Sequence, residues 1–531
     1  MRTLAVSAIL AIAALPLGAA NCSALSGLKL PNTTITAAET APAGSFNPPY
    51  GNAVDKVPAF CRVAGVIKPT TDSDIHFEVW MPASDWNGKY LGVGNGGFAG
   101  TIDFNAMAGN LKRGYATAAT DTGHQADSVD ASWAFKHPEK VIDFGYRGLH
   151  ETTERAKAII QAFYGHAAQR SYFDSCSDGG REALMEAQRF PEDFDGILAG
   201  APANYWTHML ASGIDVTKIL YGNPPGYIST TRIPAISAAT RAACDGEDGV
   251  KDGVINDPPH CHFNPSALLC KGTASRNCLT APQIVSLKKL YSGGQTANGT
   301  KLFPGAMPGA EEGPGGWSLW ITGQAPGLSL YGGFLENYFR YMVFEDPTWN
   351  ALTANVETAE RTADEKTARA LNAIDPDLRR FESHGGKLIL YHGWNDPAIS
   401  PVNTINYYKS VTAALGQEKT TSFVRLYMVP GMQHCIGGPG ATWFGQLGTV
   451  TADGPKQGIF DALEQWVEKD AAPGDIVATK YTGDNPTKPV QMTRPLCPYP
   501  QIAKYKGSGD TNNYTSFVCE QPAESSGTIS Q

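Results

Sequence analysis

The sequence SYFDSCSDGG at residues 171–180 decides the fold. Residues 171–173 have strand character, and a helical pattern runs from Gly180 to Arg189. A strand, a tight turn and a helix in this order form a nucleophile elbow when the turn carries a serine between small residues. Ser177 meets that need with Ser175 before it and Gly179 after it, although the first small residue is usually glycine. On this motif alone, a structural serine in a turn explains the residues equally well.

The segments on either side of the turn alternate between strand and helix patterns. Short runs rich in Val, Ile and aromatic residues predict strands that end in Gly-rich or polar turns. Such alternation is typical of a parallel sheet with crossover helices. The predicted strands are 76–81, 90–93, 116–119, 171–173, 196–198, 387–391 and 423–428, and the predicted helices are 149–164, 180–189 and 459–467.

The alternation breaks down between residues 204 and 382. This stretch holds four of the ten cysteines and Pro/Gly-rich pieces such as 313–316. A chain of 531 residues is long enough for two structural units, because single cores rarely grow beyond about 250–300 residues. We therefore predict a sheet-and-helix catalytic domain at 21–203 and 383–531, with an inserted lid at 204–382 (the lid segment).

Residues 1–20 have the pattern of a secretory signal peptide. A short basic start at 1–3 is followed by an apolar run at 4–17 and small residues at 18–20. An apolar run of about 14 residues is too short to span a bilayer, which disfavours a membrane anchor. Ten cysteines fit five disulfides in an exported chain, and counting alone leaves about 945 pairings open. The sequence predicts a secreted protein.

The charge of the chain argues against two classes of partner. A net charge of −9 without clustered Lys and Arg argues against nucleic acids and anionic membranes as partners. Asn-x-Ser/Thr sites at Asn32, Asn298 and Asn513 are glycan acceptors if the host is eukaryotic. The sequence does not identify the host or the oligomeric state.

Two further residues complete a candidate catalytic triad. Asp396 follows the predicted strand 387–391, and His434 follows the predicted strand 423–428. In α/β-hydrolases the triad follows the chain as Ser, then Asp or Glu, then His, with the last two on loops that leave strands. His392 is a rival base, but it precedes the only good acid and breaks that order. We predict an α/β-hydrolase fold with Ser177 as nucleophile, His434 as base and Asp396 as orienting acid.

The cysteines supply an independent argument for the triad. Cys176 adjoins the predicted nucleophile, and Cys435 adjoins the predicted base. If the two are bonded, their Cα atoms lie about 4.4–6.8 Å apart, which holds Ser177 and His434 together despite their distance in sequence. Closing so long a loop stabilises the fold by about 5 kcal/mol in the chain-entropy treatment.

At these residues the chain resembles the tannase and feruloyl esterase family, which includes the mono(2-hydroxyethyl) terephthalate hydrolases. The shared features are Cys176-Ser177, Asp396 and His434-Cys435, and further similar motifs stand at 94–100, 188–191 and 341–344. The resemblance covers nearly the whole mature chain. It implies an oxyanion hole formed by the backbone N–H groups of Asp178 and Gly97, which are donors of the usual kind. It also implies the disulfides Cys22–Cys61, Cys176–Cys435, Cys244–Cys261, Cys270–Cys278 and Cys497–Cys519.

The segment 244–254, CDGEDGVKDGV, is similar to the calcium loop of that family. Ca²⁺ takes six to eight oxygen ligands, and closely spaced carboxylates separated by glycines can fold around one ion. The alternatives are a solvated acidic turn and, for His260 and His262, a zinc site that lacks a third ligand. The resemblance implies a structural Ca²⁺ held by the carboxylates of Asp245, Asp248 and Asp252 and the carbonyls of Val250 and Val254.

The resemblance implies hydrolysis of aromatic carboxylic esters. Feruloyl esters of plant cell-wall polysaccharides are the first expectation, galloyl esters of the tannase type are the second, and terephthalate monoesters are a further possibility. Lid aromatics can stack on the acid moiety, although most such residues are core. A secreted binding protein on the same scaffold is a rival, disfavoured by the complete Ser-Asp-His order. The aromatic candidates are Trp317, Trp320, Tyr338 and Phe344.

Overall fold

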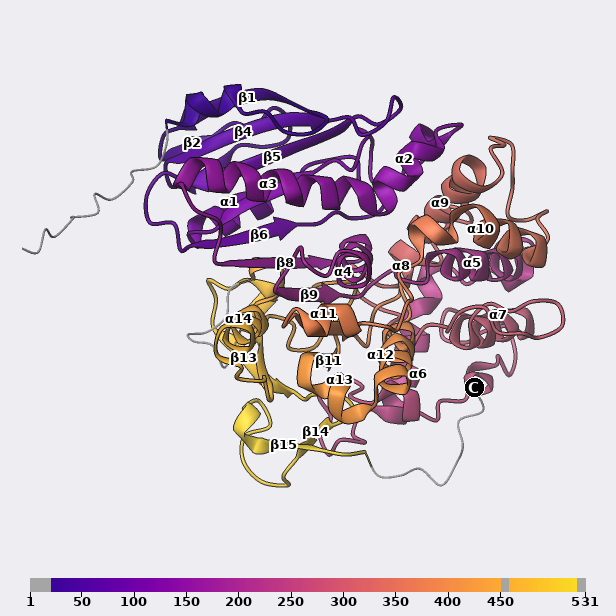
Figure 1. The fold of residues 1–531 in the computed structure, drawn as a ribbon. Helices are drawn as coiled ribbons and strands as arrows, with labels where there is room; N and C mark the ends of the chain where they lie inside the picture. Colours follow the sequence, from indigo (N-terminus) through magenta and orange to yellow (C-terminus); the bar gives the residue numbers. More distant parts are fainter. Residues whose placement is uncertain (1–20, 450–457, 523–531) are drawn as a thin grey trace, which may run out of the picture.

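A computed structural model describes residues 21–449 and 458–522; the predicted signal peptide at 1–20 lies outside the described residues. A nine-stranded sheet runs through the middle of the molecule (Figure 1) in the order β1-β4-β5-β7-β6-β8-β9-β10-β11. Its strands are β1 (Thr33–Ala41), β4 (Phe60–Ile67), β5 (Ile75–Pro82), β6 (Lys89–Val93), β7 (Ala116–Thr120), β8 (Arg170–Cys176), β9 (Gly196–Gly200), β10 (Lys387–Gly393) and β11 (Val424–Val429).

The sheet is antiparallel at one end and parallel at the other. The pairs β1–β4, β4–β5 and β5–β7 are antiparallel, whereas every pair from β7 through β11 is parallel. Strand β8 lies inside the parallel part, where Tyr172 is opposite Leu91 of β6 and Gly196 of β9. Parallel strands buried on both faces read as continuous apolar runs, which is why these strands were recognisable.

The predicted strands and helices are present, with two informative shifts. Strand β11 begins at Val424, because Gln417–Phe423 forms the helix α13. Helix α4 (Asp178–Arg189) begins directly after Ser177, two residues before the predicted start. The Arg181 guanidinium bonds the Asp178 carboxylate at 2.6 Å, and this i,i+3 contact supports helical backbone from Asp178 onward. Strands β1 and β4 were not predicted. The Ala, Thr and Glu residues of β1 show little alternation and its pairing with β4 defines it, whereas β4 does carry an apolar run.

Helices cover both faces of the sheet. Helix α3 (Gly148–Tyr164), α4 and α12 (Pro401–Leu415) share one hydrophobic core with the sheet. Helices α1 (Phe104–Lys112) and α14 (Ile459–Lys469) pack in separate cores with other residues of the sheet. This arrangement of a mainly parallel sheet between helices is the α/β-hydrolase fold that the sequence predicted.

The lid segment contributes no strand to the nine-stranded sheet and is built mainly from helices. Most of these helices stand together beside the sheet (Figure 1). One of their hydrophobic cores lies wholly within the lid segment, a second is shared with residues 98–144 and 398–399, and α11 packs through Phe381 into the core of the sheet. The division into a catalytic domain and a lid domain remains a prediction. The helices are α5 (Trp206–Tyr221), α6 (Ile233–Cys244), α7 (Ala281–Ser292), α8 (Trp317–Trp320), α9 (Leu330–Asn337), α10 (Val356–Leu371) and α11 (Arg379–Ser383).

Short elements and crosslinks complete the fold. All five implied disulfide pairs are present: Cys22–Cys61, Cys176–Cys435, Cys244–Cys261, Cys270–Cys278 and Cys497–Cys519. Such bonds persist in oxidising compartments. Within the described part of the chain, no helix has the length and apolar character needed to cross a membrane. The remaining elements are α2 (Pro138–Ile142) and the strand pairs β2 (Gly44–Phe46) with β3 (Val54–Val57), β12 (Ile476–Tyr481) with β13 (Val490–Leu496), and β14 (Ile502–Tyr505) with β15 (Phe517–Glu520).

The close contact between α4 and β9 yields a stability prediction. A Cβ atom on Gly180 would lie 2.2 Å from the Gly200 carbonyl oxygen, a backbone atom that cannot turn away. We expect Gly180→Ala to lower the free energy of unfolding by about 1–3 kcal/mol, as overpacked sites do. Gly109→Ala in α1 is the control, because open space surrounds its Cβ, and alanine there should raise stability by about 0.5–1 kcal/mol. Denaturant unfolding measures both, and equal effects would contradict the steric explanation.

Candidate active site

The turn between β8 and α4 has a strained backbone at Ser177. Its φ of 68° and ψ of −121° lie in a region that residues with side chains rarely adopt. Ser175 fits two residues earlier because Gly179 leaves room for it: a Cβ on Gly179 would lie 1.8 Å from the Ser175 hydroxyl oxygen. The departure from the usual first glycine is therefore accommodated, and the segment forms a nucleophile elbow.

The structure brings the three predicted triad residues together. The Ser177 Oγ lies 2.8 Å from His434 Nε2, and His434 Nδ1 lies 2.7 Å from Asp396 Oδ2. Because Nδ1 faces a carboxylate, it carries the proton, and Nε2 is left free to accept the hydrogen of the Ser177 hydroxyl. Ser177 comes from the end of β8, Asp396 from the loop after β10, and His434 from the loop after β11. This geometry is the one that a serine nucleophile needs.

The Asp396 carboxylate is fully buried and fully engaged. Burial alone would raise its pKa, but His434 and His392 hold the pKa of this carboxyl well below its usual range. Its other oxygen, Oδ1, accepts the backbone N–H groups of Ala398 at 2.8 Å and Ile399 at 3.0 Å. The carboxylate therefore stays ionised at neutral pH and fixes the orientation of the His434 ring.

The rival base His392 is a second partner of that carboxylate. Its Nε2 lies 3.1 Å from Asp396 Oδ2 and 3.1 Å from the Ile399 carbonyl, and its Nδ1 lies 2.7 Å from the Thr404 hydroxyl. Two acceptors around Nε2 place the proton there, so Nδ1 accepts from Thr404. His392 thus supports the acid, and His434 alone of the two contacts Ser177.

The Cys176–Cys435 disulfide ties the elbow to the histidine loop. The two Cα atoms lie 6.0 Å apart, within the range expected from the sequence, although the residues are 259 positions apart. Each cysteine is next to a triad member, so the crosslink limits how far Ser177 and His434 can separate. Cys435 also has a positive φ of 64°, which shows how tightly the chain turns there.

The two backbone groups implied as oxyanion donors border the same cavity as Ser177. Gly97 and Asp178 both line it, and neither N–H has an acceptor among the hydrogen bonds of the described residues. Asp178 is the first residue of α4, a position whose N–H has no acceptor within the helix. Its carboxylate turns away to Arg181, so only its backbone faces the reaction centre. The arrangement suits an oxyanion, and the assignment of these two donors stays a prediction.

Two buried side chains that the sequence did not single out position this region. Glu182 of α4 accepts the Asn95 N–H at 2.8 Å, and the Asn95 carbonyl accepts the Gly179 N–H at 2.8 Å. The loop at 94–97 is thereby fixed to α4 at two points. Arg181 donates to the carbonyls of Gly145 and Phe144 at 2.6 and 3.1 Å. Their burial is evident only from the structure, because charged residues such as Arg181 and Glu182 are usually exposed.

A small cavity of about 70 Å³ opens beside Ser177, and we call it the acyl pocket. Trp320 lines it and meets the His434 ring edge-on, with ring centroids 5.1 Å apart. The other predicted aromatics, Trp317, Tyr338 and Phe344, do not line it and pack among other residues of the lid segment. The remaining apolar lining residues are Ala203, Trp206, Met209, Leu210, Tyr331, Phe334, Ala398 and Ile399.

The sequence did not identify most of these lining residues as part of a pocket, although their helical spacing was visible in it. Trp206, Met209, Leu210 and Ile214 recur at helical spacing, which marks the face of α5 that turns inward. Tyr331 and Phe334 lie three apart on the short helix α9. Recognising an apolar face does not show which cavity it lines, because that depends on how the helices pack.

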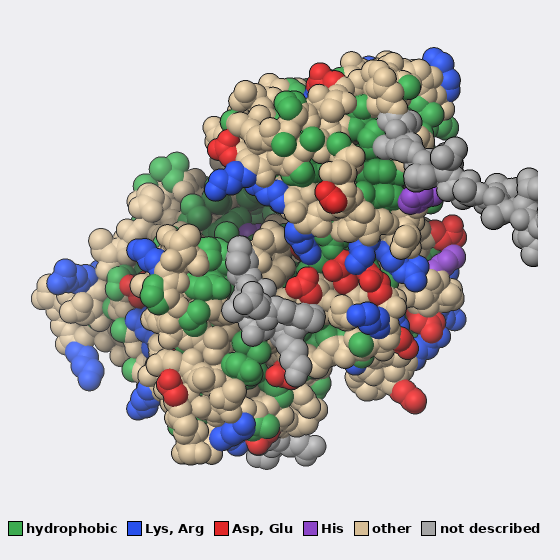
Figure 2. All heavy atoms as spheres, turned by 90° about the vertical axis from the view of Figure 1, so that its left-hand side faces the viewer, with side chains coloured by type: hydrophobic (Ala, Val, Ile, Leu, Met, Phe, Trp, Pro, Cys, Tyr) green, Lys and Arg blue, Asp and Glu red, His purple; other side chains and the backbone are tan. Residues whose placement is uncertain are grey.

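A wide groove of about 700 Å³ meets the acyl pocket at Ser177 and His434. A hollow with hydrophobic and histidine atoms at its floor is visible on the face shown in Figure 2. The groove is more polar than the acyl pocket, and its polar lining residues include Tyr50, Asn52, Asn95, Thr101, Asp103, Asn105 and Ser128. Ser177 therefore stands between an apolar pocket and a polar groove.

The candidate calcium loop is wound by its own hydrogen bonds. Asp245 accepts the N–H groups of Asp252 and Gly253, and Asp248 accepts that of Val250. Burial, together with Asp252 and Asp245 nearby, raises the pKa of Asp248 to about 6. Arg494 donates to Asp252 at 2.6 Å. Among the described residues, the groups of three metal-ligating side chains whose atoms all lie within 4.8 Å are His150–Glu186–Asp193 and His208–Glu360–Asp364, and not these aspartates.

The fold and the elbow define an α/β-hydrolase. Comparison with known proteins identifies the family: the chain matches "Tannase and feruloyl esterase" over residues 61–520 and belongs to it. It is 43% identical to an uncharacterized esterase of Xanthomonas campestris pv. campestris, covering 98% of this chain and 94% of that one. It is 34% identical to a probable feruloyl esterase B-2 of Neosartorya fischeri, covering 93% and 94%.

Solved structures agree with the assignment. Feruloyl esterase B from Aspergillus oryzae matches with a TM-score of 0.86 and 30% identity, covering 94% of this chain and 99% of that one. Tannin acyl hydrolase from Aspergillus niger matches with a TM-score of 0.72 and 23% identity, covering 92% of each chain, and shares the fold. This protein is therefore an esterase of the tannase and feruloyl esterase family, a carboxylic ester hydrolase.

We predict that the disulfide beside the triad contributes to the rate of catalysis as well as to stability. Replacing both Cys176 and Cys435 by alanine should lower kcat by more than the loss of folded protein explains. A misplacement of about 1 Å can cost on the order of a hundredfold in rate, and the crosslink limits such drift. The measurement is kcat for an aromatic methyl ester, normalised to folded protein that elutes from gel filtration at the same position as the parent enzyme.

Replacing Cys270 and Cys278 by alanine is the control, because that bond closes a loop of the lid segment with a sequence separation of 8. Equal effects of the two double variants on kcat would show that the Cys176–Cys435 bond serves stability alone. Peptide mapping without reduction checks the pairing, and alkylation of Cys176 as a free thiol in active enzyme would refute it.

Proposed function

We propose that this protein is a serine esterase that acts through an acyl-enzyme on Ser177. The observation that carries the proposal is the continuous hydrogen-bonded chain from Ser177 through His434 to Asp396, at 2.8 and 2.7 Å. An intact triad on a nucleophile elbow disfavours the rival hypothesis of a binding protein that has lost turnover.

The proposed reaction uses each of these groups at a defined atom. Ser177 Oγ attacks the ester carbonyl carbon while His434 Nε2 accepts its proton, and Asp396 stabilises the imidazolium that forms. The N–H groups of Asp178 and Gly97 receive the oxyanion. His434 then returns the proton to the leaving alcohol, and water repeats the sequence to release the acid. One oxyanion donor contributes about 2.7–4 kcal/mol to such a transition state.

The acyl pocket supports an uncharged aromatic acid as the acyl group. Its described lining holds Trp206, Trp320 and Phe334 but no Lys or Arg. A second carboxylate, as in a terephthalate monoester, would be buried there without a partner, which costs several kcal/mol. A galloyl ring would bury three hydroxyls among apolar side chains. A feruloyl or related hydroxycinnamoyl group fits this lining best.

The groove supports a polar alcohol on the other side of the ester bond. Its amides and hydroxyls suit the hydroxyl groups of a sugar, and its volume exceeds that of the acyl pocket about tenfold. We therefore propose feruloylated plant cell-wall polysaccharide as the substrate, with galloyl esters as the second candidate. The related proteins named feruloyl esterase support this choice. Five disulfides and the N-terminal sequence support secretion.

The nucleophile assignment is tested by Ser177→Ala. Ester hydrolysis should fall by on the order of 10⁴-fold or more, because a triad without its nucleophile retains only binding and oxyanion stabilisation. The assay measures kcat/KM for methyl ferulate, methyl gallate and a terephthalate monoester. For the parent enzyme we expect kcat/KM to decrease in that order.

The control for the serine substitution is Ser422→Ala, which lies on the exposed surface and should keep full activity. Activity of Ser177→Ala within tenfold of the parent would refute the triad.

We also propose that the loop 244–254 holds one structural Ca²⁺. Asp245, Asp248 and Asp252 would supply carboxylates, and Val250 and Val254 carbonyls, which are oxygen donors of the kind Ca²⁺ prefers. Asp248, Asp252 and Val254 already border one small cavity. Binding requires the carboxylates to turn toward one another and Asp252 to release Arg494. The ion would stabilise this part of the lid segment.

Chelation tests the calcium proposal. Free Ca²⁺ at a hundred times its Kd stabilises a folded protein by about 2.7 kcal/mol, so EDTA should lower the melting temperature by several degrees. Asp248→Asn should lower it similarly and make it insensitive to added calcium, whereas Asp55→Asn on the exposed strand β3 should leave the response intact. Elemental analysis that finds no metal, with an unchanged melting temperature in EDTA, would identify the loop as a solvated acidic turn.

A further inference from the structure

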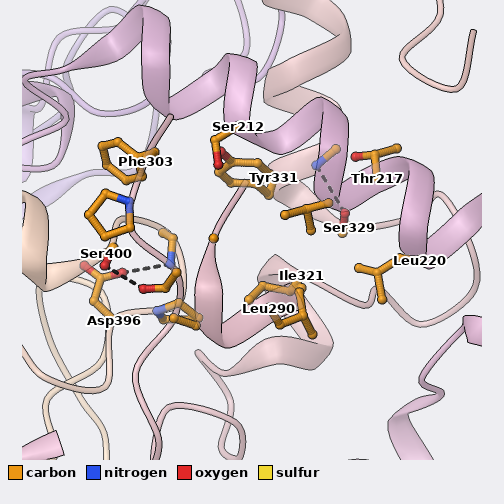
Figure 3. Close-up of a pocket in the computed structure, with 18 of the residues that line it drawn as sticks. Ser212, Thr217, Leu220, Leu290, Phe303, Ile321, Ser329, Tyr331, Asp396 and Ser400 are labelled. Carbon is orange, nitrogen blue, oxygen red and sulfur yellow. Dashed lines mark hydrogen bonds between the residues drawn. The ribbon is translucent and has the colours of Figure 1, made fainter. Parts of the chain in front are cut away.

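A second cavity adjoins the acyl pocket, between the lid segment and residues 396–400. Its volume is about 70 Å³, the same as that of the acyl pocket. Figure 3 shows Asp396 and Ser400 at one end of it and Thr217, Leu220 and Ser329 at the other, with Tyr331 above the space between them. We call this cavity the rear chamber.

The two cavities share part of their walls. Three wall segments pass from one cavity to the other through adjacent or next-adjacent residues, so the walls are continuous. Tyr331 and Ala398 line both cavities and are their shared partition. The first residue of each of the following pairs lines the acyl pocket and the second lines the rear chamber: Leu210 and Ser212, Trp320 and Ile321, and Ile399 and Ser400.

The Tyr331 ring is held in the partition by two contacts. Its hydroxyl donates to the Met209 carbonyl of α5 at 2.5 Å, which anchors the far end of the ring. Gly213, one turn further along α5, leaves the space that the ring occupies: a Cβ there would lie 2.4 Å from Tyr331 Cε1. Alanine is the only other side chain in the partition, so the ring supplies nearly all of its bulk.

The rear chamber suits an uncharged group. No Lys or Arg is among its described lining residues, and its one carboxylate, that of Asp396, is already bonded to His434 and His392. The hydroxyls of Ser212 and Ser329 accept backbone N–H groups at 3.0 and 3.1 Å. The rest of the wall includes Leu220, Leu290, Phe303 and Ile321. The chamber therefore suits an apolar group that carries at most a neutral polar substituent.

We infer that Tyr331 sets the length of the acyl group that this esterase accepts. The ring is part of the wall that the acyl pocket shares with the rear chamber, and a smaller side chain at this position joins the two cavities. An uncharged aromatic acyl group extended at the end remote from the ester then reaches past position 331. The inference rests on the proposed function, because it takes the acyl group to lie in the acyl pocket.

The test compares two methyl esters that differ only in acyl length. Methyl cinnamate is the short ester, and methyl 4-benzyloxycinnamate is the long one; the readout is the ratio of kcat/KM for the long ester to that for the short one. Tyr331→Ala should raise this ratio by roughly tenfold or more, because one methylene in an apolar pocket changes specificity roughly 10–200-fold. Tyr331→Phe, which keeps the ring and removes the hydroxyl, should leave the ratio near that of the parent.

A refilling variant separates the rear chamber from general loosening of the site. Thr217 lines the rear chamber and not the acyl pocket, so Thr217→Phe in the Tyr331→Ala background should return the ratio to the parent value. A high ratio that survives Thr217→Phe would overturn the inference, because the long group must then lie elsewhere. An unchanged ratio in Tyr331→Ala, or in Tyr331→Leu if the alanine variant does not fold, would also overturn it.

The outcome for the parent enzyme distinguishes this inference from the proposed function. If the parent hydrolyses methyl cinnamate through Ser177 and only the length ratio fails to respond, the inference about Tyr331 is wrong and the esterase assignment stands. If the parent hydrolyses neither ester and binds neither as the Ser177→Ala variant, the proposed function is wrong and the inference fails with it.

Discussion

The strained backbone at Ser177 is the constraint on which the rest of the site depends. A φ of 68° at a residue with a side chain is unfavourable, and it persists only where neighbours fix it. Here β8 is paired on both sides, and α4 begins at the next residue and packs against β9. Space for the turn comes from Gly179, which accommodates Ser175. The sheet and the helix thus hold the serine in a conformation that the isolated turn would not keep.

Separate contacts fix each of the other groups of the site relative to Ser177. Asp396 is buried, and its two oxygens accept two backbone N–H groups and two histidines, so the acid has one available orientation. The histidine loop is fixed by the bond between Cys435 and Cys176. The loop at 94–97 is attached to α4 through Glu182 and Asn95. Both oxygens of the Asp396 carboxylate have partners, which makes that part of the buried network stable, whereas Glu182 Oε1 and Asn95 Oδ1 have no hydrogen-bond partner among the described residues.

The sequence predicted the parts that local chemistry determines. The parallel strands carry continuous apolar runs, and the triad order and the adjacent cysteines need no knowledge of packing. Strands β1 and β4 were not predicted, and β1 is defined by its pairing with β4. Helix α4 begins earlier than predicted because Arg181 binds Asp178. Of the four lid aromatics that the sequence singled out, Trp320 alone lines the acyl pocket, because position along a helix does not fix which cavity a side chain faces. The helical spacing of Trp206, Met209 and Leu210 was visible in the sequence, whereas the cavity that these residues line was not.

The chemistry and the specificity of this esterase therefore have different origins in the chain. Ser177, Asp396 and His434 stand on turns and loops that leave strands of one sheet, where pairing restricts movement. The aromatic wall of the acyl pocket comes largely from α5, α8 and α9, which belong to the lid segment and contribute nothing to that sheet. A substitution such as one at Tyr331 changes the space offered to the acyl group without touching the hydrogen bonds of the triad. Helices inserted between β9 and β10 can thus vary in sequence while the reaction centre stays the same.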